Sequence, residues 1–245
     1  RGNIYDRNGI ILAASVPSKS LSAKPYLIKD INNLSYKLEQ ILNIDKKIIQ
    51  KKLSSNKKFV WLKRNITPLE QQKIIDLGEI NLTFNNETKR LYPFQNSTSH
   101  VVGFVNIDQK GQTGIERFYD KSLLSSNDIF LSIDVNLQQS IRSNLIKTVK
   151  HYEAESGLAL VLDISNGELL SSVSYPDFNP NKKDFNENNL INRVIQSNYE
   201  MGSTFKPLTI ANGFDYNVIN SEMIFDIKKS VKGVRDHDNY KEDGL

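Results

Sequence analysis

A glycine and a proline at positions 202 and 207 set the strongest local constraint on how this chain can fold. Gly202 permits a sharp turn, whereas Pro207 lacks a backbone N–H and is tolerated mainly in the first turn of a helix. The residues that follow suit the apolar side of a helix, namely Leu208, Ile210, Ala211 and Phe214. The pattern therefore predicts a buried helix that begins near Ser203.

Ser203 and Lys206 lie at the start of this predicted helix. Residues i and i+3 share one face of a helix, so Lys206 Nζ can reach Ser203 Oγ. The positive end of the helix dipole and burial would both favour the neutral form of Lys206. A neutral lysine can accept the serine proton and turn the hydroxyl into a nucleophile. The alternative is that Ser203 only caps the helix while Lys206 is solvated, and the local pattern leaves both interpretations open.

The bare Ser-x-x-Lys pattern has low specificity, because it also occurs from Ser54 to Lys57 and from Ser55 to Lys58. Those two occurrences lie in a polar, lysine-rich stretch, which is typical of a solvated helix end or loop. Only the occurrence at Ser203 is flanked by the glycine, the proline and the apolar run.

Composition excludes several classes of protein. The chain has 245 residues, of which 38% are hydrophobic and 24% charged, as expected for one large or two ordinary soluble globular domains. It has no cysteine, which excludes disulfides and cysteine-based zinc sites. Its net charge of +4 is modest and its lysines are spread along the chain, so we expect no nucleic-acid partner. The sequence contains no run of 18 apolar residues, so we expect no membrane span within it. Because residue 1 is Arg rather than Met, we expect the chain to be a piece of a longer protein.

A polar stretch at residues 125–128 has the composition of a linker. It divides the chain into two predicted domains, residues 1–128 and 129–245. For the first domain the patterns predict a hairpin over residues 1–14 with its turn at 6–9, helical periodicity over 28–56, a strand over 59–62, a helix opened by a Thr67–Glu70 capping box, strand-like residues 80–93 and a short helix at 113–123.

The second predicted domain opens with a short strand over residues 130–133. A long amphipathic helix follows, with Asp134 at its N-cap. Residues 157–164 and 168–174 flank an Asn-Gly pair and predict a second hairpin. An extended loop over residues 175–181 then leads toward the predicted Ser203 helix.

A series of short motifs runs through most of the chain in one order. They are Arg1-Gly2-x-Ile4-x-Asp6-Arg7-Asn8-Gly9, Gly114-Ile115-Glu116-Arg117 with Leu123, Ile133-Asp134-x-x-Leu137-Gln138, Asp163-x-x-x-Gly167-Glu168, Tyr175-Pro176-x-Phe178-x-Pro180-Asn181, Asn192-Arg193, Tyr199-Glu200-Met201-Gly202-Ser203-Thr204-Phe205-Lys206 and Val234-Arg235-Asp236-His237. The ordered set resembles class B penicillin-binding proteins, the serine D,D-transpeptidases that cross-link bacterial peptidoglycan. The last two motifs resemble the division-specific branch called penicillin-binding protein 3.

The resemblance implies an α+β fold in two parts. Residues 1–128 would form a mixed α/β pedestal of dimerisation type. Residues 129–245 would form the N-terminal part of a penicillin-binding, β-lactamase-like transpeptidase domain.

The resemblance also implies the chemistry. Ser203 would be the nucleophile that attacks the penultimate D-Ala carbonyl of a stem peptide, and Lys206 would be the general base. The backbone N–H of Ser203 would be half of an oxyanion hole. Neither a metal nor an organic cofactor is implied.

Partners and location follow from the same resemblance. The implied ligands are peptidoglycan stem peptides and β-lactam antibiotics, and the implied protein partners are division or glycosyltransferase proteins of the membrane. We expect this region to lie in the periplasm, anchored to the bacterial inner membrane by an N-terminal helix absent from this chain.

The chain departs from the family's catalytic set in one respect. No Ser-x-Asn triplet follows Ser203, and neither Lys-Thr-Gly nor Lys-Ser-Gly occurs anywhere, although the family uses all three motifs. We therefore expect these 245 residues alone to be nearly inactive and to bind β-lactams poorly.

Two alternative functions remain. One is a different serine acyl enzyme, such as a β-lactam sensor or a β-lactamase, which would share Ser-x-x-Lys but not the N-terminal motifs. The other is a non-catalytic docking module for division or cell-wall partners, formed by residues 1–128. The carboxylate-rich Asp236-His237-Asp238 fails the calcium-loop spacing and is interpreted as a solvated loop.

Overall fold

The computed structural model describes residues 1–182 and 185–224, and the chain divides into two compact units, Arg1–Ser197 and Asn198–Leu245. The motif at 234–237 and the Asp236–Asp238 loop lie outside the described residues. The elements of the first unit are β1 (Ile4–Tyr5), β2 (Ile11–Ala23), η1 (Pro25–Leu27), α1 (Ile31–Leu42), α2 (Lys46–Leu53), β3 (Val60–Ile66), α3 (Pro68–Ile75), β4 (Leu82–Leu91), η2 (Gln95–Thr98), α4 (Ser99–Val102), α5 (Gly114–Phe118), α6 (Asp120–Leu124), β5 (Ile129–Phe130), α7 (Val135–His151), β6 (Gly157–Leu162), β7 (Leu169–Tyr175), η3 (Glu187–Leu190) and α8 (Arg193–Gln196).

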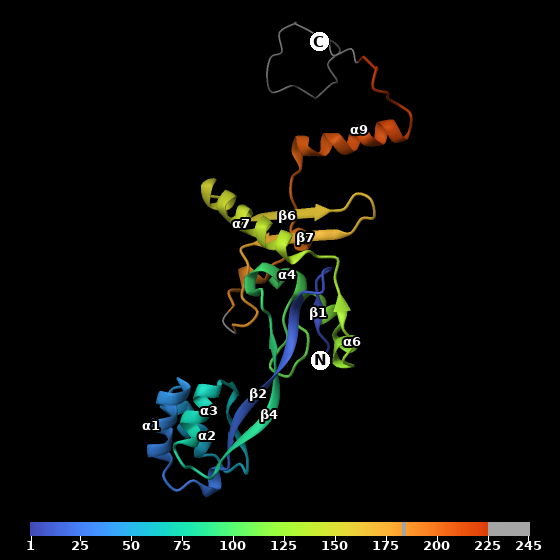
Figure 1. Cartoon of the computed structure of the whole chain (residues 1–245). Coiled ribbons are helices and arrows are strands. Elements are labelled where there is room, and N and C mark those ends of the chain that lie inside the picture. Colours follow the sequence, from blue (N-terminus) through green and yellow to red (C-terminus); the bar gives the residue numbers. More distant parts are fainter. Residues whose placement is uncertain (183–184, 225–245) are drawn as a thin grey trace. The chain divides into compact units, whose positions relative to one another are not determined.

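The predicted N-terminal hairpin is confirmed. The Asp6 carboxylate accepts hydrogen bonds from the backbone N–H of Asn8 and of Ile10, both at 2.8 Å, and Gly9 takes a positive φ of 78°. The second strand is longer than the sequence predicts. β2 continues to Ala23, and its residues from Ala14 onward pair with the whole of β4 (Figure 1). The two strands form one long antiparallel ribbon.

Three helices cover one face of the far end of this ribbon, where β3 joins β2 (Figure 1). The helical stretch predicted over residues 28–56 is two helices, because the chain turns at Asn43 with a left-handed φ of 52°. The capping box is confirmed: Thr67 Oγ1 accepts from Glu70 N at 3.2 Å and Glu70 Oε2 accepts from Thr67 N at 2.7 Å. The enclosed core consists of Leu21, Ala23, Ile28, Leu34, Leu38, Leu42, Ile49, Leu53, Val60, Leu62, Ile66, Ile74 and Leu82.

A second core surrounds the N-terminal hairpin and consists of Ile4, Leu12, Ala13, Tyr92, Val102, Leu123 and Val135. β5 pairs with β1 in parallel, and Asp6 Oδ2 accepts from the backbone N–H of Val135 at 3.2 Å. Segments on both sides of residue 128 therefore share this core. The division of the chain at 128 stays a prediction.

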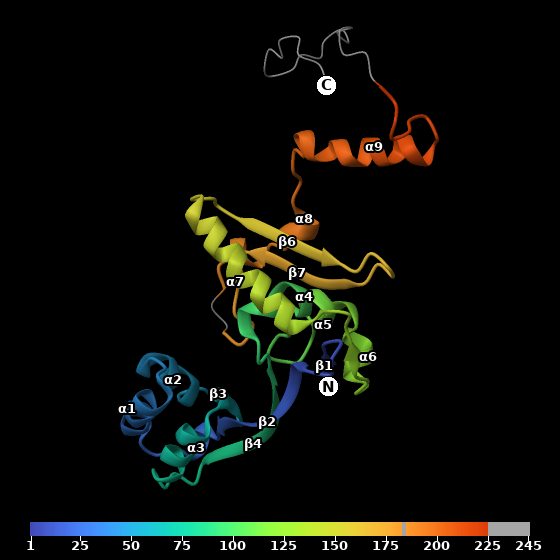
Figure 2. The ribbon, with the colours of Figure 1, turned by 45° about the horizontal axis from the view of Figure 1, so that its top comes forward.

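The second predicted hairpin is confirmed as the antiparallel pair β6–β7, and α7 lies across it (Figure 2). Gln138, which is buried on α7, fixes this packing with both ends of its amide. Its Oε1 accepts from Ser172 N and Ser171 Oγ, each at 2.8 Å. Its Nε2 donates to Ser172 O at 2.7 Å and to Ser97 O at 2.9 Å, which ties α7 to η2 as well.

Asp134 caps α7 as predicted, accepting from the backbone N–H of Asn136 at 2.9 Å and of Leu137 at 3.1 Å. We expect Asp134→Ala to lower the free energy of unfolding by about 1 kcal/mol at neutral pH, measured by urea denaturation. Asp134→Asn is the control, because it keeps an N-cap acceptor. The hydrogen bond from Leu137 lowers the pKa of Asp134, so the carboxylate's contribution is complete above its ordinary pKa and is lost as the pH falls through the folded value. An alanine variant as stable as the parent would contradict the capping role.

Within the two described ranges, no helix is both long and apolar enough to cross a membrane.

Candidate active site

The Ser203 segment belongs to the second unit and forms a turn that runs into a helix. Residues Gly202–Phe205 are a 3-10 helix, η4, followed directly by α9 (Lys206–Asp215). Gly202 has a positive φ of 53°, which accounts for the glycine, and Pro207 lies in the first turn of α9. The predicted helix start is therefore confirmed.

Ser203 lies inside η4, and Lys206 is the first residue of α9. A 3-10 helix has three residues per turn, so side chains at i and i+3 lie on the same side. The N-cap positions of η4 and α9 are Met201 and Phe205, so Ser203 occupies neither. The alternative in which Ser203 only caps the helix is therefore wrong for this structure.

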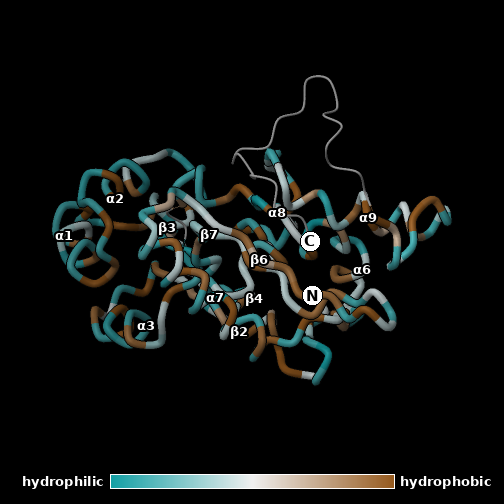
Figure 3. The backbone as a smooth tube through the Cα atoms, turned by 90° about the horizontal axis from the view of Figure 1, so that it is seen from above, coloured by the Kyte–Doolittle hydropathy of each residue, from teal (hydrophilic) through white to brown (hydrophobic). Residues whose placement is uncertain are grey.

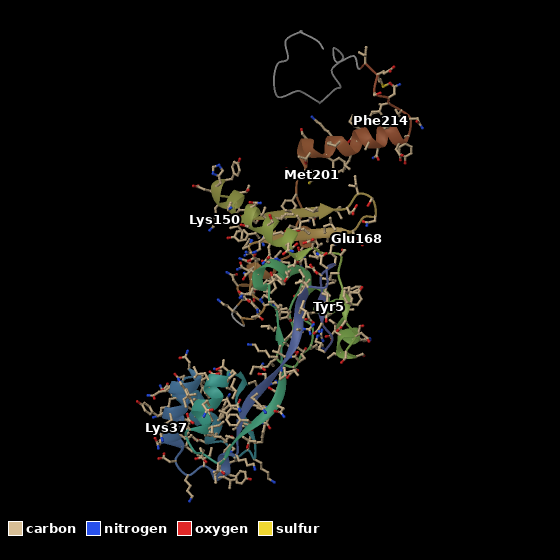
Figure 4. The ribbon with its side chains drawn as sticks, viewed as in Figure 1. Tyr5, Lys37, Lys150, Glu168, Met201 and Phe214 are labelled. Carbon is tan, nitrogen blue, oxygen red and sulfur yellow. The ribbon has the colours of Figure 1, made fainter. Side chains whose placement is uncertain are left out.

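Burial of the site is the point on which the sequence prediction was wrong. Ser203 and Lys206 are both exposed, and the apolar residues of α9 are exposed too, with Leu208 at 57%, Ile210 at 46% and Phe214 at 45%. Figure 3 shows hydrophobic and hydrophilic stretches alternating along α9, and Figure 4 places Met201 before the helix and Phe214 near its end. One helix cannot cover its own apolar face, and the short turn η4 is the only other helix or strand in the described part of this unit.

The backbone N–H groups of the turn are only partly used. Thr204 N donates to Met201 O at 3.1 Å, and Lys206 N donates to Ser203 O. Among the described residues, no hydrogen bond involves the N–H of Ser203. An unused N–H at the start of a helical turn is a suitable donor for an anion.

The other two Ser-x-x-Lys patterns behave as predicted. Ser54 is the C-cap residue of α2, and the Ser55 hydroxyl donates to Lys52 O at 2.8 Å. Lys57 and Lys58 are exposed. This stretch is a solvated helix end.

A buried charged cluster in the first unit was not found from the sequence. Glu116, which is fully buried, receives Arg1 at 2.7 Å on Oε2 and Arg90 at 2.7 Å on Oε1. The Tyr92 hydroxyl contacts the same Oε1 at 3.4 Å, and burial, together with the charge of Glu116, raises the pKa of Tyr92. Arg1 also binds Asp120 at 2.8 Å. Of the five residues in this cluster, Arg1 and Glu116 belong to the sequence motifs described above. No signal in the sequence indicated that they would contact Arg90 or Tyr92.

Metal binding has no structural support in the described residues, since no group of three or more His, Cys, Asp or Glu side chains there could hold an ion. His100 instead forms a hydrogen bond through Nε2 with Asn189 O at 2.9 Å. Burial lowers the pKa of His100, so this ring is a packed side chain held by a backbone carbonyl and not part of a metal-ligand group in the described residues.

Two family descriptions match the chain and cover almost all of it. The penicillin-binding protein dimerisation domain matches residues 1–162, and the penicillin-binding protein transpeptidase domain matches residues 157–244. The chain belongs to the penicillin-binding proteins. The predicted α+β fold and family are confirmed, and the transpeptidase match includes both Ser203 and Lys206.

Relatives with curated names agree. The chain is 31% identical to the probable peptidoglycan D,D-transpeptidase PenA of Neisseria gonorrhoeae, over 88% of this chain and 43% of the relative. It is 30% identical to the peptidoglycan D,D-transpeptidase FtsI of Escherichia coli K12, over 91% of this chain and 44% of the relative. The chain thus spans somewhat less than half the length of these relatives.

A solved structure has the same fold. It is a peptidoglycan synthetase from Bifidobacterium adolescentis, with a TM-score of 0.60 and 21% identity, matched over 90% of this chain and 51% of the other. At this identity the likeness concerns the fold alone.

Proposed function

We propose that this chain is part of a peptidoglycan D,D-transpeptidase in which Ser203 is the nucleophile and Lys206 the general base. The observation that carries the proposal is the position of the Ser-x-x-Lys pair: it lies on one side of a helical turn, inside the stretch that matches the transpeptidase domain. The names of the relatives support the same activity.

Acylation follows from this pair. Ser203 Oγ attacks the carbonyl carbon of the penultimate D-Ala of a stem peptide, and Lys206 Nζ takes the hydroxyl proton. The terminal D-Ala leaves when its nitrogen receives that proton, and an ester on Ser203 remains. An amine from a second stem peptide then attacks the ester, which forms the cross-link and returns a proton to Ser203.

The negative charge that forms on the oxygen of the tetrahedral intermediate is stabilised by hydrogen-bond donors. The N–H of Ser203, which lacks a described partner, would supply one of the two hydrogen bonds of an oxyanion hole. The second N–H would come from the Lys-Thr-Gly strand that the family uses and that these residues lack.

Inhibition by β-lactams follows from the same chemistry. Attack of Ser203 on the lactam carbonyl opens the ring, and the lactam nitrogen receives the proton. The nitrogen stays tethered to the acyl group, so no fragment departs and the ester persists.

The setting belongs to the proposal as well. The motif around Ser203 favours the division branch, with a septal role in a periplasm-facing protein held at the inner membrane. Divisome or glycosyltransferase partners would then lie close to residues 1–128.

The test is acylation of the full-length protein by a fluorescent penicillin. We expect about one equivalent of ester, mapped by mass spectrometry to a peptide that contains Ser203. The 245-residue chain should be labelled far more slowly. A stable ester on any other serine would refute the assignment, and rapid stoichiometric labelling of the short chain would refute its predicted inactivity.

A second candidate function is docking by residues 1–128, and one observation favours it. Apolar side chains stand exposed around α1–α3, with Tyr26 at 64%, Leu69 at 66% and Ile80 at 89%. Leu69→Ser combined with Ile80→Ser in the full-length protein separates the two roles. Docking predicts lost septal recruitment with penicillin acylation retained, and unchanged recruitment would count against it.

A further inference from the structure

The positive charge of the chain is concentrated in one stretch of the first unit. Residues 24–58, which contain η1, α1 and α2, hold nine lysines and three acidic residues, a net charge of +6. All other residues of the chain together carry −2. The overall charge of +4 is therefore the sum of a strongly basic segment and a weakly acidic remainder. Such an asymmetry favours contact with an anionic partner.

The structure leaves the charge of this stretch without compensation. Its three carboxylates accept hydrogen bonds from backbone N–H groups of α1 and α2. The pairs are Asn33 N to Asp30 at 3.0 Å, Lys47 N to Asp45 at 2.6 Å and Lys46 N to Glu39 at 2.9 Å. None of the nine lysines forms an ion pair in the described part of the chain, and seven of the nine are exposed. Their charge is therefore not neutralised within the protein.

The helices α1 and α2 pack against each other (Figure 1). Gln50 Nε2 on α2 donates to Asn32 Oδ1 on α1 at 2.8 Å. At the other end of the pair, Lys46 Nζ lies 5.9 Å from the ring centroid of Tyr36. Side chains of the two helices therefore contribute to one outer surface.

The exposed side of α2 is both basic and apolar. Lys47 and Lys51 are exposed, and a spacing of four residues places them on the same face of the helix. Ile48 is 52% exposed beside them, and Tyr36 on α1 is exposed to the same extent. We define the α1–α2 surface as Tyr36, Lys46, Lys47, Ile48 and Lys51.

We propose that the α1–α2 surface binds the anionic lipid headgroups of a membrane surface. Each lysine close to an anionic lipid surface adds to the attraction. An acidic protein would complement the charge alone, but Ile48 and Tyr36 are exposed among the lysines. Apolar and tyrosine side chains are favoured at the boundary between headgroups and acyl chains, so the combination favours a lipid surface. This binding goes beyond the proposed transpeptidase activity and does not depend on Ser203.

Sedimentation of the 245-residue chain with lipid vesicles is the test. Phosphatidylcholine vesicles that contain about one third phosphatidylglycerol should bind at least about tenfold more tightly than vesicles of phosphatidylcholine alone. At about 1 M salt, where the Debye length is about 3 Å, binding should fall to the level of the neutral vesicles. Equal binding to the two kinds of vesicle at low salt would overturn the proposal.

Two double variants separate the charge from the apolar contact. Lys47→Gln combined with Lys51→Gln should weaken binding to anionic vesicles by about tenfold or more. Tyr36→Ser combined with Ile48→Ser should weaken it by about fivefold or more and leave binding to poly-L-glutamate unchanged. All four side chains are exposed, so both variants should fold, which thermal unfolding followed by circular dichroism checks.

Lys147→Gln combined with Lys150→Gln is the matched control. These lysines are also exposed and lie on α7, outside the α1–α2 surface, so vesicle binding should not change. A loss equal to that of the Lys47 and Lys51 variant would mean that only the net charge of the chain matters, and the proposal would fail. Tighter binding to poly-L-glutamate than to anionic vesicles would identify an acidic protein as the partner and would also refute it.

Discussion

Replacing Ser203 by alanine in the full-length protein is expected to abolish acylation by a fluorescent penicillin, because no other hydroxyl would take its place as the nucleophile. Replacing Lys206 by methionine should slow acylation by about 10²- to 10⁴-fold, the usual contribution of a positioned base. Both side chains are exposed in the described structure, so neither change should lower the free energy of unfolding by more than about 1 kcal/mol.

The arginine variant separates two roles of Lys206. A lysine that acts as a base must release a proton, and arginine stays charged at any accessible pH. Lys206→Arg should therefore be about as slow as Lys206→Met. Acylation by the arginine variant at close to the parent rate would show that only a positive charge is needed.

The chain provides its own matched control. Ser54→Ala and Ser55→Ala remove serines with the same Ser-x-x-Lys spacing at the end of α2, and acylation should not change. Loss of labelling in either variant would contradict the assignment of the reaction to residues 203–206.

Local chemistry was enough to predict much of the fold. The turn at Asp6–Gly9, the capping box at Thr67 and the cap at Asp134 each depend on residues within four positions of one another. Interactions between residues so close in the sequence can be predicted from local patterns, and all three were predicted. The start of the helix after Ser203 was predicted for the same reason.

The parts that were not predicted depend on residues far apart in the sequence. Glu116 meets Arg90 across 26 positions and Arg1 across 115, and no local rule pairs them. Burial of Lys206 was predicted wrongly on the same ground, because apolar periodicity in α9 shows that a helix has a face to bury but not which segment covers it. The catalytic roles of Ser203 and Lys206 stay predictions.

The buried cluster around Glu116 leads to the second large prediction. Its carboxylate carries both guanidinium groups, and the side chains of Arg1, Arg90 and Glu116 are at most 2% exposed. Removing one member of such a cluster leaves buried charge without compensation. Glu116→Ala should therefore lower the free energy of unfolding by about 3–5 kcal/mol, seen as a fall in the melting temperature of roughly 10 °C or more.

The surface ion pair between Arg7 and Glu168 is the matched control for this cluster. It joins Arg7 Nη2 to Glu168 Oε2 at 3.2 Å, with side chains 36% and 43% exposed, and Figure 4 shows Glu168 at the β6–β7 end of the first unit. Glu168→Ala should cost at most about 1 kcal/mol, because water screens an exposed pair. Both variants remove a glutamate carboxylate, but Glu116 is buried and Glu168 is exposed. Equal losses would mean that the energy at Glu116 does not come from uncompensated buried charge.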